Sequence, residues 1–143
     1  MIGAMGEDSL ALCRRAYQLY GQGLFDDMLE LFAEDVEVYV GPPNIESGTY
    51  SGRDSCRKLI ERWGGSWSEM VIEPQSMELA GEWVLAKVEY YGRTRDDDLE
   101  VRQMSWEASR WLHGQVQRYE VYWDADEGAR MFAQRQAEAA SAQ

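Results

Sequence analysis

The sequence predicts an α+β fold, in which helices pack on one curved antiparallel sheet. In residues 8–35 and 51–63, apolar side chains recur every three or four positions, which is the period of a helix. Residues 66–123 are instead rich in β-branched and aromatic side chains, which suit strands. The helices are therefore largely segregated from the strands along the chain. A strongly curved sheet wrapped over a long helix would leave room for a cavity.

The bulk composition fits one domain and argues against several function classes. A chain of 143 residues can bury one core, which we place at about residues 8–135, with loose ends at 1–7 and 136–143. The net charge of −12 argues against binding to nucleic acid or to an anionic membrane surface. The start of the chain shows no signal-peptide pattern, and no stretch approaches ~18 consecutive apolar residues. We therefore expect a cytoplasmic protein.

Three helices are expected in the first half of the chain. The first begins near Asp8, and the second covers residues 24–35. A strand at residues 36–40 follows, and then a loop at residues 44–50. The SGRD motif that begins at Ser51 resembles a capping box, and it is expected to open the third helix.

Four strands and a closing helix are expected in the second half. Residues 66–79 and 82–91 form two strands, and Pro74 suggests that the first of them is a sheet edge or carries a bulge. The hairpin at residues 101–124 supplies the other two strands, with its turn at the His-Gly pair. A second capping box starts the last helix, which is expected from Asp124 to about Arg135.

Glu107, near the middle of the first arm of the hairpin, is the most informative residue for function. It lies at strand spacing from Ser109 and Trp111, so the three side chains share a face. Buried in a pocket, Glu107 would contact a ligand or act as a general acid or base. It could instead be hydrogen-bonded to Tyr90, Tyr119 or water and only order the core. A one-residue slip of the strand would turn it outward.

The expected pocket lining is apolar and aromatic, with a few polar tips, as small-molecule sites usually are. The residues expected to contact a ligand are Tyr17, Val40, Trp63, Tyr90, Tyr119 and Trp123. The three tyrosines offer hydroxyl groups to a carbonyl or a phenol, or else they fill the core with their hydroxyls bonded locally. The two tryptophans are expected to form aromatic walls. Other residues expected to face inward are Ala16, Tyr20, Val36, Val38, Leu59, Val84, Ala86, Val88, Gln117 and Val121.

The opposite face of the hairpin mixes charged and aromatic residues. It carries Arg102, Arg110, Arg118 and Glu120 beside tryptophans and tyrosines. This composition is typical of an interface rather than of a solvated sheet, so we expect a homodimer through the outer sheet face.

Neither a metal nor a cofactor is expected. Cys13 and Cys56 match no metal or redox spacing and are interpreted as buried, reduced thiols. The acidic run at residues 96–98 is interpreted as a solvated loop, because no further ligands lie at a recognisable spacing.

Five segments of the chain share an order and a spacing with a known superfamily. They are GLFDDMLELFAEDVEVYVGP (residues 23–42), SGRDSCRKLI (51–60), VEYYGRT (88–94), WLHGQV (111–116) and YWD (122–124). Their arrangement, over about residues 10–132, resembles the nuclear transport factor 2-like superfamily, which includes ketosteroid isomerases and SnoaL-like polyketide cyclases. The resemblance implies a single SnoaL-like domain of the cystatin-like barrel type. Its cone-shaped, curved antiparallel sheet would wrap around a long N-terminal helix and enclose an apolar pocket, commonly in a homodimer.

The catalytic positions of the superfamily are only partly matched. Ketosteroid isomerases use a tyrosine of the first helix, an aspartate ending the first strand and a protonated aspartate of the fourth strand. The matching residues here are Ala16, Val40 and Glu107. Scytalone dehydratase-like and SnoaL-like enzymes need histidine, but the single histidine, His113, lies in a turn. Limonene-epoxide hydrolase-like enzymes have an arginine where this chain has Ser105.

We therefore predict a protein that binds a hydrophobic cyclic or aromatic small molecule. If it is an enzyme, the resemblance implies a cofactor-independent isomerase, cyclase or dehydratase with Glu107 as the proton carrier. The alternative is a non-catalytic ligand-binding or dimerisation module, because one fold hosts many functions.

Overall fold

The structure, a computed structural model, describes residues 2–44 and 46–142, with side chains from Asp8 onward. The helices and strands follow in the order α1 (Ile2–Gly21), α2 (Phe25–Leu29), β1 (Phe32–Val40), β2 (Gly48–Ser51), α3 (Arg53–Gly65), β3 (Trp67–Ala80), β4 (Trp83–Thr94), β5 (Glu100–Leu112), β6 (Gln115–Tyr122) and α4 (Ala125–Ser141).

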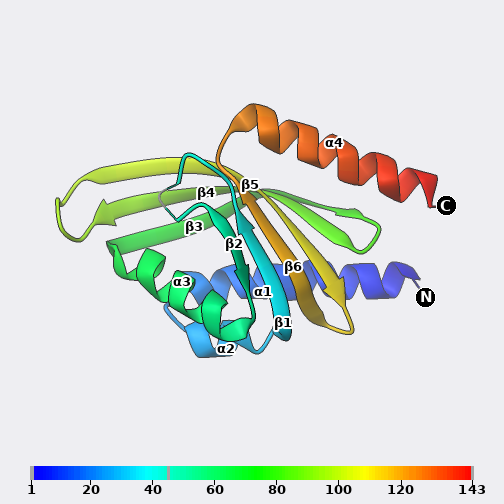
Figure 1. The fold of residues 1–143 in the computed structure, drawn as a ribbon, viewed down its shortest axis with the longest axis horizontal. Coiled ribbons are helices and arrows are strands. Elements are labelled where there is room, and N and C mark those ends of the chain that lie inside the picture. Colours follow the sequence, from blue (N-terminus) through cyan, green and yellow to red (C-terminus); the bar gives the residue numbers. More distant parts are fainter. Residues whose placement is uncertain (1, 45, 143) are drawn as a thin grey trace.

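The strands form one curved, six-stranded sheet in the order β2-β1-β6-β5-β4-β3 (Figure 1). The sheet is not closed, since β2 and β3 are its edges. Neighbouring strands run antiparallel, except that β1 and β6 run parallel. The predicted α+β class is confirmed, whereas the expectation of a purely antiparallel sheet is wrong at this one pair. An alternating pattern determines which side chains share a face, but it does not determine the direction of the neighbouring strand.

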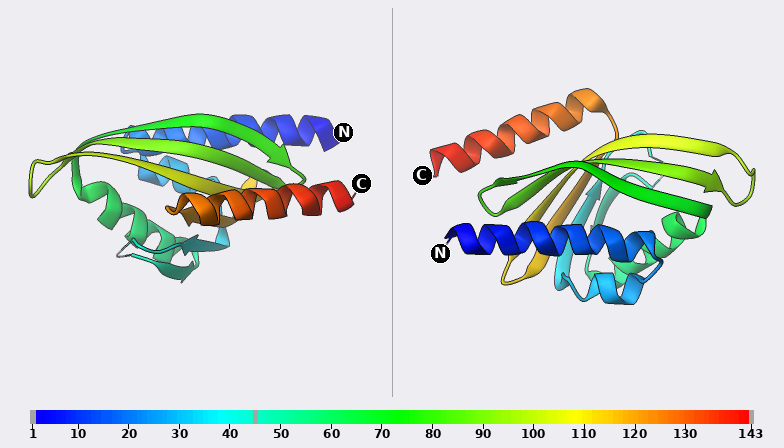
Figure 2. Two further views of the ribbon diagram at one scale, coloured as in Figure 1. Left: turned by 90° about the horizontal axis from the view of Figure 1, so that it is seen from above. Right: turned by 180° about the vertical axis from the view of Figure 1, so that it is seen from behind.

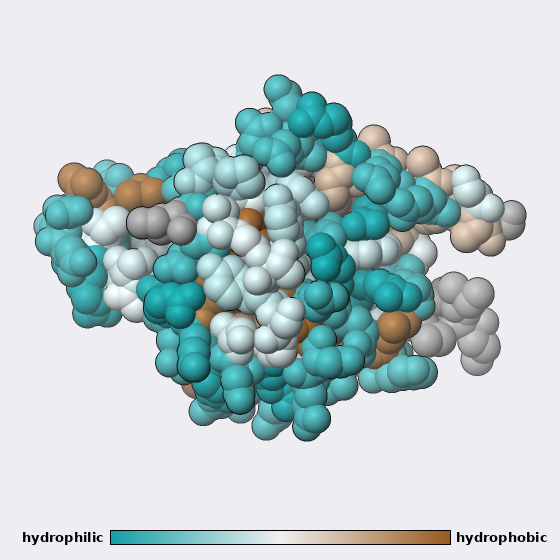
Figure 3. Space-filling view, viewed as in Figure 1, coloured by the Kyte–Doolittle hydropathy of each residue, from teal (hydrophilic) through white to brown (hydrophobic). Residues whose placement is uncertain are grey.

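Helices cover both faces of the sheet. α1, α2 and α3 lie on one side, which we call the inner face, and α4 lies on the other, the outer face (Figure 2). The larger apolar core lies on the inner face, where Leu29, Val36 and Val88 are fully buried. The surface seen in Figure 3 is largely hydrophilic, with apolar side chains visible in small areas between polar ones. The apolar side chains that form the helical and strand patterns of the sequence thus lie mostly in the interior.

A second, smaller core holds α4 against the outer face. Met131 of α4 packs there with Leu85 of β4 and Ala108 of β5, all of them buried. Gly128 lies so close to Trp106 that an added Cβ atom would come within 2.3 Å of the indole ring. A larger residue at this position would therefore push the helix away from the sheet.

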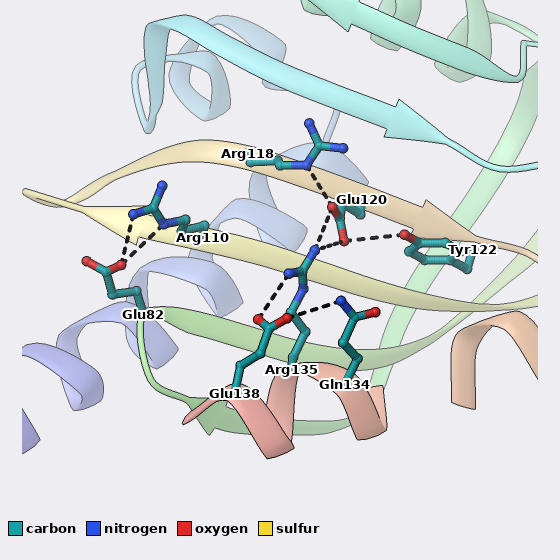
Figure 4. Close-up of polar contacts among 8 residues, drawn as sticks. All are labelled: Glu82, Arg110, Arg118, Glu120, Tyr122, Gln134, Arg135 and Glu138. Atoms are coloured by element: carbon teal, nitrogen blue, oxygen red, sulfur yellow. Dashed lines mark hydrogen bonds and ion pairs between the residues drawn. The ribbon is translucent and has the colours of Figure 1, made fainter. Parts of the chain in front are cut away.

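A buried ion cluster also ties α4 to the sheet. Glu120 of β6 is 2 % exposed and accepts hydrogen bonds from Arg118 Nε at 2.7 Å and from Arg135 Nη2 at 2.9 Å (Figure 4). The Arg135 guanidinium lies 3.9 Å from the centre of the Trp83 ring. Two guanidinium partners compensate for burying this carboxylate. The sequence placed Glu120 on the outer face but gave no indication of its partner on α4.

The hairpin of β5 and β6 follows the prediction. His113 and Gly114 both have positive φ angles, of 54° and 77°, as a tight two-residue hairpin turn requires. Pro74 lies in the edge strand β3, where the register shifts between Pro74 and Ser76. The predicted edge position and bulge are therefore both confirmed.

Two elements near β1 differ from the prediction because strand pairing overrides the local pattern. The helix expected over residues 24–35 ends at Leu29, since Phe32 pairs with Val116 of β6 and the Val116 amide donates to the Leu31 carbonyl at 2.8 Å. The loop expected at residues 44–50 contains the start of β2, which pairs with β1. That strand is short and mostly exposed, so it has no apolar alternation to reveal it.

The ends of the helices also differ from expectation. Residues 2–7 and 136–141, predicted to be loose, belong to α1 and α4, where Ala, Met, Gln and Glu are strong helix formers. The N-cap of α3 is Gly52 rather than Ser51, and no side chain in the described part of the chain caps this helix. The cap of α4 is confirmed, because Asp124 Oδ2 accepts from the Glu127 amide at 2.9 Å. Even at these lengths, none of the described helices is both long and apolar enough to cross a membrane.

Candidate functional site

A cavity of about 110 Å³ lies between the inner face of the sheet and the helices α1 and α3. Its lining is mainly apolar, and it includes aromatic rings from both the helices and the strands. Among the described residues, no lysine, arginine or histidine lines it. This composition is the one that small-molecule sites usually show.

All six residues predicted to contact a ligand line this cavity. They are Tyr17 from α1, Val40 from β1, Trp63 from α3, Tyr90 from β4, Tyr119 from β6 and Trp123 just after β6. The strand residues meet because alternate side chains of each strand point to the same face, and the helix residues meet them because α1 and α3 pack on that face. Their contact with a ligand stays a prediction.

Three of these residues form one continuous aromatic wall. The rings of Trp63 and Tyr90 meet nearly at right angles, with 4.9 Å between their centres. The Trp123 ring lies 5.7 Å from Tyr90 and 6.1 Å from Trp63. Offset and edge-to-face contacts of this kind are the favoured arrangement of aromatic pairs. The three rings therefore support one another at one side of the cavity.

Glu107 lies directly behind the cavity, at the centre of a cluster of hydroxyl groups. It is 1 % exposed, and it is not among the described residues that line the cavity. Its Oε1 atom accepts hydrogen bonds from Tyr17 at 2.7 Å and from Tyr119. Its Oε2 atom accepts from Tyr90 at 2.5 Å and from Ser105 at 2.7 Å. These four donors match the four acceptor positions that two carboxylate oxygens offer.

The tyrosines of this cluster hold their protons firmly. Burial raises the pKa of Tyr17, Tyr90 and Tyr119 well above the ordinary value, and the charge of Glu107 raises it further. The three hydroxyls are therefore protonated at neutral pH and remain donors to the carboxylate. Because these tyrosines also line the cavity, they connect it to Glu107.

Of the three interpretations of Glu107, the outward orientation is wrong. The register pairs Glu107 with Ala86 on one side and Val121 on the other, which places its side chain on the inner face. The hydrogen bonds to Tyr90 and Tyr119 that the second interpretation expected are present. A direct contact between Glu107 and a ligand would require a tyrosine to move.

Both cysteines are free and line the cavity. Burial raises the pKa of each thiol to about 12, so neither is a nucleophile at neutral pH. The Cys13 thiol lies 3.7 Å from the Ser109 hydroxyl, which accepts a hydrogen bond from Trp111 Nε1 at 2.8 Å. No group of histidine, cysteine and carboxylate side chains in the described part of the chain could hold a metal ion.

Sequence reasoning missed two parts of the site. Ser105 stands two residues before Glu107 on the same strand, so strand spacing could have placed it on the same face. Asn44 and Glu46 line the cavity from the connection between β1 and β2, where no periodic pattern exists to place them. Glu46 is bound to Arg62 at 3.1 Å, and this hydrogen bond lowers the pKa of its carboxyl.

Together, the open curved sheet, its helical cover and the aromatic cavity define a class of small α+β proteins built around an internal site. Within this class, the sequence pattern of the SnoaL-like domain family matches residues 13–119. The chain belongs to that family. No curated protein matches it.

Solved structures show the same fold at low identity. A nuclear transport factor 2-like protein of unknown function from Burkholderia pseudomallei K96243 is similar with a TM-score of 0.74 and 18 % identity, over 86 % of this chain and 95 % of that one. A ketosteroid isomerase-like protein from Catenulispora acidiphila DSM 44928, in complex with trimethylamine, has a TM-score of 0.70 and 13 % identity, over 80 % and 85 %. SalBIII is an epoxide hydrolase/cyclase-like enzyme with a role in pyran ring formation in the polyether salinomycin. It has a TM-score of 0.72 and 14 % identity, over 88 % of this chain and 96 % of that one. The match to the SnoaL-like domain family, together with this shared fold, confirms the superfamily that the motifs predicted.

Replacing Tyr17 by phenylalanine tests the hydroxyl cluster. Hydrogen bonds to charged groups contribute about 1.5–3 kcal/mol, so Tyr17→Phe should lower the free energy of unfolding at pH 7 by about that amount in urea denaturation. Tyr39→Phe is the matched control, because the Tyr39 hydroxyl makes no hydrogen bond with the residues that the structure describes. The control should change stability by less than about 0.5 kcal/mol. Equal effects of the two substitutions would contradict the role given to Tyr17.

Proposed function

We propose that the chain binds a compact hydrophobic molecule, cyclic or aromatic, in the cavity between the sheet and α1 and α3. The observation that carries this proposal is the convergence of three cavity-lining tyrosines on the buried carboxylate of Glu107. One polar patch in an otherwise apolar lining can orient a ligand, while the aromatic wall supplies the buried contact area.

The volume of the cavity restricts the size of the ligand. An engineered protein cavity of about 150 Å³ holds benzene. A cavity of about 110 Å³ therefore suits a single ring with few substituents. A fused-ring molecule would require the side chains that line the cavity to move apart.

A matched pair of substitutions tests the binding site. Ala16 lines the cavity, so Ala16→Leu fills part of it, whereas Ala129→Leu adds the same atoms to an exposed position of α4. Single-ring compounds are screened by thermal unfolding and calorimetry. A compound at a hundred times its Kd should stabilise the wild type by about 2.7 kcal/mol, and it should do so in Ala129→Leu but not in Ala16→Leu. A compound that stabilises all three proteins equally would bind elsewhere.

Cofactor-free acid–base catalysis is the second candidate function. It is favoured by one observation, namely that each cavity-lining tyrosine donates to Glu107. A proton leaving a bound ligand could pass to a tyrosine oxygen while that tyrosine passes its own proton to the carboxylate. Glu107 would then be the proton carrier of an isomerase, a cyclase or a dehydratase, although it does not touch the ligand.

Hydrogen exchange at carbon tests this catalytic candidate without a known product. Ligands found in the screen are followed by NMR in D₂O with the wild type and with Glu107→Gln. General acid–base help contributes roughly 10²–10⁴-fold, so Glu107→Gln should slow enzyme-dependent exchange by about that factor. Glu120→Gln, which changes the buried carboxylate of the outer face, should leave exchange unchanged. Equal exchange in wild type and Glu107→Gln would reject the candidate.

A homodimer through the outer face and a cytoplasmic location stay predictions. On that face, α4 already covers Leu85, and it packs against Trp83 and Trp106. An interface on this side would therefore involve the helix as well as the strands.

A further inference from the structure

We propose that the ligand of this cavity is a protonated amine that carries a single apolar ring. The inference rests on the proposed binding function and adds that the ligand carries one positive charge. Three features of the described residues carry it, namely the direction of the tyrosine hydrogen bonds, the lack of a cation for Glu107 and the aromatic wall.

The direction of the hydrogen bonds determines which groups the cavity can recognise. A tyrosine hydroxyl has one proton, and Tyr17, Tyr90 and Tyr119 each donate that proton to Glu107. Each oxygen is left with acceptor capacity only. A ligand N–H or O–H group can donate to these oxygens. A carbonyl or carboxylate cannot accept from these three hydroxyls unless a tyrosine first abandons Glu107, which would leave the buried carboxylate short of a donor. A remaining donor is Trp123 Nε1 on the aromatic wall, which is buried and has no hydrogen-bond partner among the described residues.

The charge of the site favours a cation over a neutral donor. Glu107 makes no ion pair with any residue in the described ranges, and its four partners are neutral hydroxyls. Glu46, the other carboxylate at the cavity, already has Arg62 as its partner. We take Glu107 as a carboxylate ion, which gives the cavity a negative charge without a partner cation among the described residues. Inside a protein this field is weakly screened, so it attracts an ammonium group and repels a carboxylate.

The aromatic wall suits the same ligand. Aromatic rings pack favourably in offset or edge-to-face contacts, so a wall of tryptophan rings suits the apolar ring of the ligand. Trp63, Tyr90 and Trp123 line the cavity together, and Tyr90 also belongs to the hydroxyl cluster. The ammonium group would therefore lie at the tyrosine oxygens, with the apolar ring of the ligand packed on the two tryptophans.

Three single-ring compounds of similar size but different charge test the inference. Benzylammonium, benzyl alcohol and benzoate are titrated into the full chain at pH 7 by calorimetry. We expect benzylammonium to bind at least about tenfold tighter than benzyl alcohol, and benzoate to bind most weakly, since tenfold corresponds to one modest electrostatic contact. Glu107→Gln keeps the size of the side chain and removes its charge. It should bring benzylammonium to within about threefold of benzyl alcohol, while Glu120→Gln should keep the wild-type order.

The outcomes separate this inference from the proposed function. If benzyl alcohol binds in the cavity but benzylammonium binds no tighter, or benzoate binds tightest, the charge assignment is overturned and the binding function stands. If none of the three compounds binds, both proposals are overturned. If Glu107→Gln does not fold, the order of the three affinities in the wild type tests the charge assignment, and Tyr17→Phe serves as the second variant. Because Tyr17→Phe lacks one acceptor hydroxyl, it should lose more affinity for benzylammonium than for benzyl alcohol.

Discussion

A buried carboxylate is stable only when hydrogen-bond donors occupy its lone pairs. Glu107 and its tyrosine donors come from four elements of the fold. Glu107 lies in the middle of β5, while its tyrosine donors come from α1, β4 and β6. Loss of a donor would leave a charged group partly unsatisfied in the interior, which costs more than the loss of an exposed contact. The same hydrogen bonds therefore hold α1 against the sheet and present the tyrosines to the cavity.

The two faces of the hairpin solve the problem of a buried carboxylate in different ways. Glu120 stands opposite Ala108, the chain neighbour of Glu107, so the two carboxylates lie almost back to back across the sheet. On the outer face, two guanidinium groups neutralise Glu120. On the inner face, hydroxyl groups donate hydrogen bonds to Glu107 and bring no positive charge to it. The outer carboxylate is thus paired with cations, whereas the inner one has no cation beside it among the described residues.

The sequence predicted most of the fold, because alternating and helical patterns report which side chains are buried. It also predicted six residues that line one cavity, because the spacing of side chains indicates which of them share a strand face or a helix face. It did not predict β2, the early end of α2 or the parallel pairing of β1, because these depend on contacts with distant strands. Nor could it show Tyr17 and Tyr119 meeting at one oxygen of Glu107, because that depends on how α1 crosses the sheet.

The amine proposal and the catalytic candidate both depend on Glu107 being a carboxylate ion that accepts hydrogen bonds from hydroxyl donors. Infrared difference spectroscopy between the wild type and Glu107→Gln, at neutral pH with isotope-labelled glutamate, tests this charge state most directly. The account predicts that the difference spectrum shows the loss of a carboxylate stretching band, and that Tyr17→Phe shifts this band by removing one donor. The loss of a protonated carboxyl C=O band instead would contradict the account, since a neutral Glu107 would leave one tyrosine proton free for the ligand.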